Sequence, residues 1–125
     1  MSGRDNLRIL VVDDDEAIRM LVIRLFQRRG YDVRGASDGQ EAIDILEHEE
    51  FDLMILDLMM PRVDGIGVIE HVAASSRPSP RIIVMTAAAP NIVVRVPEEK
   101  IWKVITKPFD LDVLLQHADE ALGAA

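Results

Sequence analysis

Short apolar runs alternate with longer amphipathic segments along the whole chain. The apolar runs show little polar alternation, which is typical of strands buried on both faces of a sheet. The amphipathic segments repeat hydrophobic residues at helical spacing. The predicted strands are 8–12, 31–36, 51–57, 81–86 and 102–106. Four helices are predicted. The first is capped by Asp15 and ends near Arg29, the second and third span 40–49 and 66–75, and the last is capped by Asp110.

This alternation predicts an α/β fold in which a parallel sheet is covered by helices on both faces. The strand 31–36 is more polar than the others, so we expect it at an edge of the sheet. Ligands of such sheets bind at the carboxyl ends of the strands. Five polar residues then fall on one rim, namely Asp13, Asp14, Asp57, Thr86 and Lys107. The length favours a single domain, 1–125, with its core at about 7–122.

The segment 87–101 departs from the alternation, because a fourth helix is expected there and its sequence suits a helix poorly. Pro90 and Pro97 bracket the residues 91–96, and four of these six are β-branched. Such side chains lose freedom in a helix, and proline limits its length. The sequence therefore predicts a short, distorted or absent fourth helix.

The composition excludes several classes of function. The chain has no cysteine, which rules out disulfides and thiolate chemistry. Its net charge of −8 argues against direct DNA binding, because nothing offsets the repulsion of the phosphates. The apolar run 53–60 is interrupted by Asp57, so no membrane span is predicted, and the N-terminus lacks a signal-peptide core. These features favour a cytoplasmic protein.

The acids on the predicted rim suit phosphoryl chemistry. Asp13, Asp14 and Asp57 offer oxygen ligands to a hard cation, and Mg²⁺ fits best because it also shares phosphate oxygens. With the cation in place, Asp57 can attack phosphorus as a carboxylate nucleophile. Lys107 can bring its charge to one phosphoryl oxygen, and the Thr86 hydroxyl can donate to another.

Four short motifs lie at the ends of the predicted strands. They are Val11-Val12-Asp13-Asp14, Asp57 with Met60-Pro61 and Asp64-Gly65, Met85-Thr86-Ala87, and Thr106-Lys107-Pro108-Phe109. Together they resemble the receiver domains of two-component response regulators, close in size to the chemotaxis-type single-domain members. The resemblance covers essentially the whole chain. It implies a doubly wound, flavodoxin-like receiver fold with five parallel strands in the order 2-1-3-4-5.

By this resemblance, Asp57 would be the phosphoacceptor and would receive its phosphoryl group from a histidine kinase or a histidine phosphotransfer protein. Asp14 would bind Mg²⁺ directly and Asp13 mainly through water. The backbone carbonyl of Met59 would complete the protein ligands of the ion.

The resemblance also implies that Thr86 and Lys107 would bind the phosphoryl group and report its arrival, and that the peptide between Lys107 and Pro108 would be cis. The chain would be a signalling domain, not an enzyme in the usual sense, although it would support its own phosphoryl transfer and dephosphorylation. A downstream protein would be its second partner. The formation of a homodimer on phosphorylation stays an open alternative.

Two departures from the family bear on switching. The family usually has Tyr or Phe three residues before the lysine, and here that residue is Val104. Trp102 is a substitute candidate on the same strand face, although we expect it in the core. Met59 and Ala88 are apolar at the positions that tune hydrolysis of the acyl phosphate in the family, so we expect slow self-dephosphorylation.

Some of these residues also have a purely structural explanation. The acids after the first strand could serve only the helix N-terminus, which we expect of Asp15 alone. The rival functions are a non-switching, receiver-like interaction module and a Mg²⁺-dependent phosphohydrolase. Such a phosphohydrolase commonly needs an acid at the position that Met59 occupies. Nucleotide binding is disfavoured, because no glycine-rich loop follows the first predicted strand. A piece of a longer regulator would look the same as a stand-alone receiver.

Overall fold

The computed structural model describes residues 7–58, 60, 64–86, 101–107 and 109–123. These residues form one parallel sheet of five strands in the order β2-β1-β3-β4-β5. The strands are β1 (Arg8–Val12), β2 (Asp32–Ala36), β3 (Leu53–Asp57), β4 (Arg81–Thr86) and β5 (Lys103–Thr106). The predicted fold class and strand order are therefore confirmed, and the polar strand β2 lies at an edge as expected.

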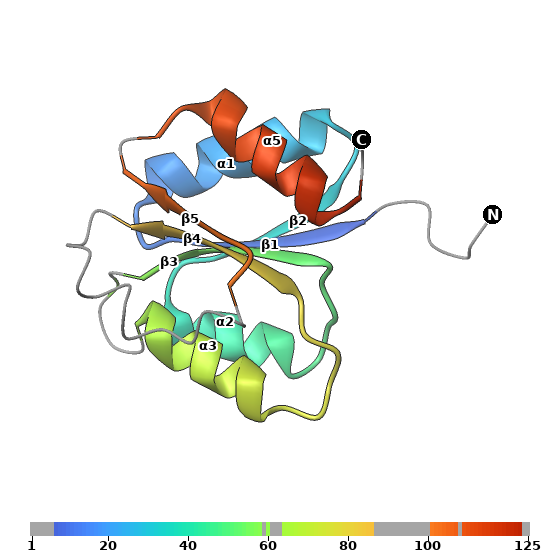
Figure 1. Ribbon diagram of the computed structural model, residues 1–125. Coiled ribbons are helices and arrows are strands. Elements are labelled where there is room, and N and C mark those ends of the chain that lie inside the picture. Colours follow the sequence, from blue (N-terminus) through green and yellow to red (C-terminus); the bar gives the residue numbers. More distant parts are fainter. Residues whose placement is uncertain (1–6, 59, 61–63, 87–100, 108, 124–125) are drawn as a thin grey trace.

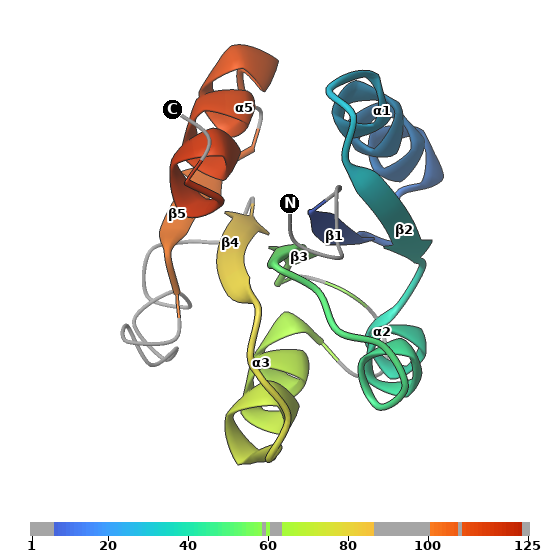
Figure 2. The same ribbon diagram turned by 90° about the vertical axis from the view of Figure 1, so that its right-hand side faces the viewer.

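In the part of the chain that the structure describes, two pairs of helices cover the sheet, one pair on each face. Helices α1 (Glu16–Arg28) and α5 (Leu111–Ala121) lie on one side, and α2 (Gly39–Leu46) and α3 (Gly65–Ala74) lie on the other (Figures 1 and 2). The short, distorted or absent fourth helix was predicted for residues 87–101, and all of these except Ile101 lie outside the described residues. Among the described helices, none is long and apolar enough to cross a bilayer.

The sheet separates two hydrophobic cores. In β1, Leu10 and Val12 pack with the α2–α3 layer, whereas Ile9 and Val11 pack with the α1–α5 layer. All four side chains have no exposed surface. Successive strand residues point to opposite faces, so a strand between two helix layers must be apolar at every position. This requirement explains the uninterrupted apolar runs in the sequence.

Each described helix begins at an aspartate that caps it. The carboxylates of Asp15, Asp38, Asp64 and Asp110 accept hydrogen bonds from backbone N–H groups of the first helical turn. Such a cap stabilises a helix by about 1 kcal/mol and sets where it begins. The caps at Asp15 and Asp110 confirm the sequence prediction.

Helix α2 ends earlier than the sequence predicted. It was expected to continue to residue 49 and ends at Leu46. The residues that follow are mostly acidic, and the negative end of the helix dipole disfavours carboxylates there. Glu49 instead bridges Arg8, at 2.7 Å, and Arg34. The acidic run thus ties the end of α2 to the neighbouring strands β1 and β2.

The prediction that Trp102 belongs to the core is wrong. Trp102 immediately precedes β5 and is 40% exposed. The Arg81 guanidinium lies over its ring, 4.4 Å from the ring centroid, a distance typical of a cation–π contact. Val104 is also exposed. Because β5 is an edge strand, its residues are less enclosed than those of the central strands.

Tyr31 joins the segment before β2 to α5. Its hydroxyl donates a hydrogen bond of 2.9 Å to Asp119, which also pairs with Arg29. Burial, followed by the hydrogen bond and charge of Asp119, raises the pKa of Tyr31 from 10.0 to about 12, although Arg29 acts in the opposite direction. The folded state thus holds this proton more tightly than the unfolded chain. The resulting stabilisation is present below pH 10 and is lost as the pH rises toward 12.

We therefore expect the tyrosinate absorbance of the folded protein to titrate with a midpoint near 12. The signal is unambiguous because the chain has a single tyrosine. Asp119→Asn should lower the midpoint, since it removes the charge that disfavours tyrosinate. Glu120→Gln, the same charge change one residue away, should leave it in place. A wild-type midpoint near 10, with the fold intact by circular dichroism, would contradict this account.

Candidate functional site

Three aspartates meet where β1 and β3 end. Asp57 is the last residue of β3, and Asp13 and Asp14 follow β1 directly. The two strands are adjacent and parallel, with Val12 beside Leu56, so their carboxyl ends lie together. One carboxylate oxygen from each aspartate lies within 4.8 Å of those of the other two. Asp13 and Asp57 are buried and Asp14 is exposed, so the cluster opens to solvent on the side of Asp14.

Lys107 reaches this cluster from the end of the edge strand β5. Its Nζ donates to Asp13 Oδ2 at 3.1 Å and to Asp57 Oδ2 at 3.2 Å. Burial acts to lower the pKa of Lys107, but the hydrogen bonds and charges of Asp13 and Asp57 outweigh it and raise the pKa above its ordinary value. The lysine is therefore a fixed positive charge at neutral pH, held between two buried carboxylates.

Thr86 lies at the end of β4, between Asp57 and Lys107 in the order of the strands. It is buried and pairs with Thr106 of β5. Its backbone carbonyl accepts a hydrogen bond of 2.9 Å from the Lys107 N–H. The five side chains that the sequence placed on one rim thus lie at the carboxyl ends of four neighbouring strands, as the parallel topology requires.

The loop after β1 is held by several contacts on Asp13. Its N–H donates to the Ala36 carbonyl at 3.2 Å, and its Oδ1 accepts from the Asp15 N–H at 2.9 Å. Its own carbonyl accepts from Arg19 Nη1 at 2.9 Å. Arg19 carried no signal in the sequence, where it is one of several arginines on a predicted helix.

Gly65 allows α3 to begin directly against Asp57. An ideal Cβ at Gly65 would lie 2.6 Å from the Asp57 carbonyl oxygen and 2.6 Å from Leu58 Cα, both of them backbone atoms. Any side chain there would push the end of β3 out of place. The sequence showed Gly65 only as part of a motif, and the structure gives it this packing role.

The donor set fits a hard divalent cation. Three carboxylates face one ammonium group, so the cluster keeps an excess of negative charge. Its ligand atoms are all oxygens, which suits Mg²⁺ and not the softer transition metals. The resemblance implied a carbonyl ligand at Met59 and a cis peptide before Pro108. Both residues lie outside the described residues, as does Ala88.

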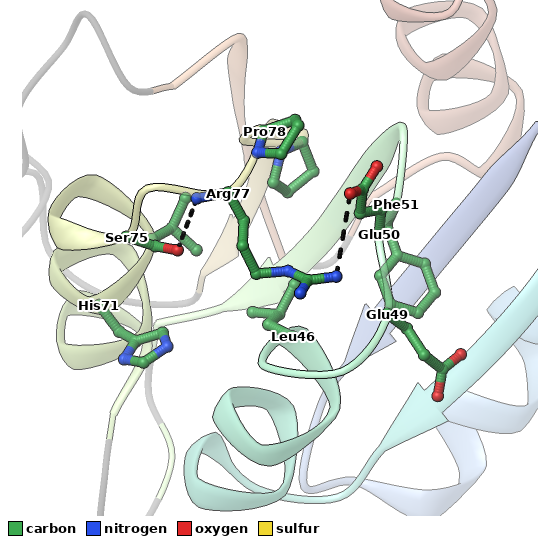
Figure 3. Close-up of a pocket in the computed structure, with 10 residues that line it drawn as sticks. Leu46, Glu49, Glu50, Phe51, His71, Ser75, Arg77 and Pro78 are labelled. Atoms are coloured by element: carbon green, nitrogen blue, oxygen red, sulfur yellow. Dashed lines mark hydrogen bonds and ion pairs between the residues drawn. The ribbon is translucent and has the colours of Figure 1, made fainter.

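A separate hollow lies between the ends of α2 and α3, on the side where β3 and β4 begin (Figure 3). Arg77 points across it toward Glu50, at 3.9 Å, and Phe51 and Val72 help to line it. Its free volume is about 20 Å³, which is room for roughly one water molecule. This hollow is too small for a ligand and lies away from the aspartates.

Comparisons with known proteins agree on one family. The model of the response regulator receiver domain matches residues 9–119. The transcriptional regulatory protein PdtaR of Mycobacterium tuberculosis is 33% identical over 117 residues, which are 93% of this chain and 57% of that protein. Sporulation initiation phosphotransferase F of Bacillus subtilis is 36% identical over 110 residues, 86% of each. The chain thus spans little more than half of the mycobacterial relative.

The fold is also that of solved receiver structures. The response regulator TrrA of Thermotoga maritima, in complex with Mg²⁺-BeF, matches with a TM-score of 0.81 and 30% identity, over 93% of this chain and 99% of that one. The likeness extends over both helix layers and the sheet, because it leaves so little of either chain unmatched.

The crowding of carboxylates has a measurable consequence for stability. In metal-free buffer, Asp14→Asn should raise the unfolding temperature, because it removes one of three like charges. Added Mg²⁺ should stabilise the wild type by mass action and stabilise this variant much less. Thermal unfolding with chelator and with Mg²⁺ measures both effects.

Asp15→Asn is the matched control for this experiment. It makes the same charge change one residue away, and asparagine caps a helix as well as aspartate does. The Mg²⁺ response of this control should equal that of the wild type. Equal Mg²⁺ stabilisation of wild type and Asp14→Asn would contradict the assignment of Asp14 to the cation site.

Proposed function

We propose that this chain, which belongs to the response regulator receiver domain family, is a phosphoacceptor of two-component signalling that takes a phosphoryl group onto Asp57. The observation that carries the proposal is the geometry of Asp57. Its carboxylate lies at the end of a central strand, clustered with Asp13 and Asp14 and bound by Lys107 at 3.2 Å. The donor would be a phosphohistidine of a histidine kinase or a histidine phosphotransfer protein.

The transfer needs position and charge, and the residues supply both. An Asp57 carboxylate oxygen would attack phosphorus, forming the acyl phosphate while the bond from phosphorus to the histidine nitrogen breaks. Bound Mg²⁺ would neutralise the phosphoryl oxygens and the carboxylates. Asp14 would ligate the ion directly, Asp13 mainly through water, and Met59 through its carbonyl. The chain therefore acts as a receiver that supports its own modification.

Lys107 and Thr86 would hold the transferred group. The ammonium group of Lys107 already lies 3.2 Å from Asp57 Oδ2, and its raised pKa keeps it charged. It would therefore meet a phosphoryl oxygen as a cation. The Thr86 hydroxyl, on the adjoining strand, would donate to another oxygen. The backbone bond between the two residues links any movement of the lysine to the end of β4.

Phosphorylation of Asp57 would also have a downstream response. We propose that phosphorylation changes the affinity for a protein partner, in a single receiver domain that works in the cytoplasm without binding DNA itself. Val104 excludes an aromatic switch at its position, so a rearrangement would pass through Lys107 and Thr86 instead. The rival function, a non-switching interaction module, is also consistent with Val104 in place of an aromatic residue. It predicts that the affinity for the partner does not depend on phosphorylation.

Incubation with Mg²⁺ and a small phosphodonor should add one phosphoryl group, seen by intact-mass spectrometry. Asp57→Asn should show no added mass, because the amide is no nucleophile of this kind, and chelator should abolish the adduct in the wild type. Asp52→Asn makes the same substitution just before the start of β3, at the end of the strand opposite Asp57, and this variant should still be phosphorylated. A wild type that binds Mg²⁺ and acquires no phosphoryl group would favour the non-switching module.

Loss of the phosphoryl group should then be slow. Met59 and Ala88 carry no polar group to orient an attacking water. After removal of the donor, the phosphorylated mass should persist for many minutes at neutral pH. Introducing an acid or amide, as in Met59→Asn, should shorten its lifetime. A wild-type half-life of seconds would contradict this expectation.

A further inference from the structure

Arg19 binds the backbone at the point where the acidic loop turns. It lies in the second turn of α1, and its Nη1 donates to the Asp13 carbonyl oxygen at 2.9 Å. That carbonyl belongs to the peptide group that joins Asp13 to Asp14. The bond therefore restrains the plane of this peptide, and with it the direction in which Asp14 leaves the chain.

Asp14 depends on its backbone more than the other two acids do. Asp13 is fixed through its own side chain, which binds the Asp15 N–H at 2.9 Å and Lys107 at 3.1 Å. Asp57 is buried at the end of a strand. Asp14 is exposed, so the packing that orients a buried side chain does not act on it. The peptide groups on either side set the direction of its Cα–Cβ bond, and so limit the positions that its carboxylate can take.

The sequence leaves room for Arg19 to reach this position. Gly35 of β2 pairs with Val11 and presents no side chain toward α1. An ideal Cβ at Gly35 would lie 3.5 Å from Arg19 Cδ and 2.7 Å from the end of Ile23. The stem of Arg19 therefore lies along the strand where the glycine leaves space. Arg19 is partly buried, unlike the exposed Arg24 on the same helix.

We propose that Arg19 is a positioning residue of the cation site, which holds the peptide between Asp13 and Asp14 so that the Asp14 carboxylate faces Asp57. The proposal rests on the proposed function, because it assigns to Asp14 the role of a Mg²⁺ ligand. Arg19 touches neither the cation nor the phosphoryl group in this role. It acts through the backbone of the ligand residues, as supporting hydrogen bonds do at other metal sites.

The charge of Arg19 and its proposed positioning role predict opposite changes in Mg²⁺ affinity when Arg19 is replaced. A guanidinium beside an acidic cluster repels a divalent cation, so its removal would tighten Mg²⁺ binding if charge alone mattered. A positioning role has the opposite consequence, because a loosened loop must be ordered when the ion binds. The two effects can therefore be told apart by the direction of one measured change.

The test compares Arg19→Met with Arg24→Met by calorimetric titration with Mg²⁺. Both variants lose one positive charge from α1, and methionine keeps much of the aliphatic stem. We expect Arg19→Met to bind Mg²⁺ roughly tenfold more weakly than Arg24→Met. Arg19→Lys, which keeps a donor and the charge, should recover part of the affinity. Binding by Arg19→Met that equals or exceeds that of Arg24→Met would overturn the proposal.

A second readout needs no metal. Hydrogen exchange of the Asp15 N–H, which donates to Asp13 Oδ1, should be faster in Arg19→Met, while exchange in the central strand β3 stays unchanged. Faster exchange throughout the protein, or no local change, would count against a positioning role. If the wild type itself binds no Mg²⁺, the proposed function fails. The exchange measurement then still decides whether Arg19 orders this loop.

Discussion

The ion pairs of Lys107 with Asp13 and Asp57 are the contacts on which the whole rim depends. Two buried carboxylates at neighbouring strand ends repel each other, and burial removes the water that would screen them. Lys107 offsets this repulsion from the far edge of the sheet, at 3.1 and 3.2 Å. The ion pairs tie the edge strand β5 to the centre of the sheet, and they hold the acids together in a form that a cation can still enter from the side of Asp14.

The fold brings these charges together by simple means. Parallel strands place their carboxyl ends at one edge, and the helices that follow begin there at capping aspartates. The same edge therefore collects both the acids that cap helices and the acids that form the site. Asp13 and Asp15 show how close the two roles lie, since the N–H of Asp15, which caps α1, donates to the carboxylate of Asp13.

Much of this could be predicted from the sequence, because hydrophobic pattern and chain topology determine it. Apolar runs such as 53–56 located the strands, and the acids and lysine at strand ends were placed on one rim. The roles of Arg19 and Gly65 could not be predicted, because both depend on how closely particular atoms approach across a turn, which the hydrophobic pattern does not reveal. Trp102 was misassigned because the sequence pattern does not show that β5 is an edge strand, whose residues are less enclosed than those of the central strands. The early end of α2 reflects competition between local helix propensity and the ion pairs of Glu49, which no local pattern reveals.

The route by which such a site can report its state follows from the same contacts. Phosphorylation of Asp57, as proposed, would replace a carboxylate by a larger group of higher charge, and Lys107 would have to share its donors between that group and Asp13. Lys107 is bound through its own N–H to the Thr86 carbonyl, and Thr86 pairs with Thr106. A shift of the lysine would therefore be transmitted to the carboxyl ends of β4 and β5. On the edge strand β5 Val104 is exposed, whereas Trp102 and Arg81 lie at the opposite, amino ends of β5 and β4. If Asp57 is phosphorylated as proposed, the bond between Lys107 and Thr86 would thus give a backbone route from Asp57 to the edge strand β5, where Val104 replaces the usual aromatic residue.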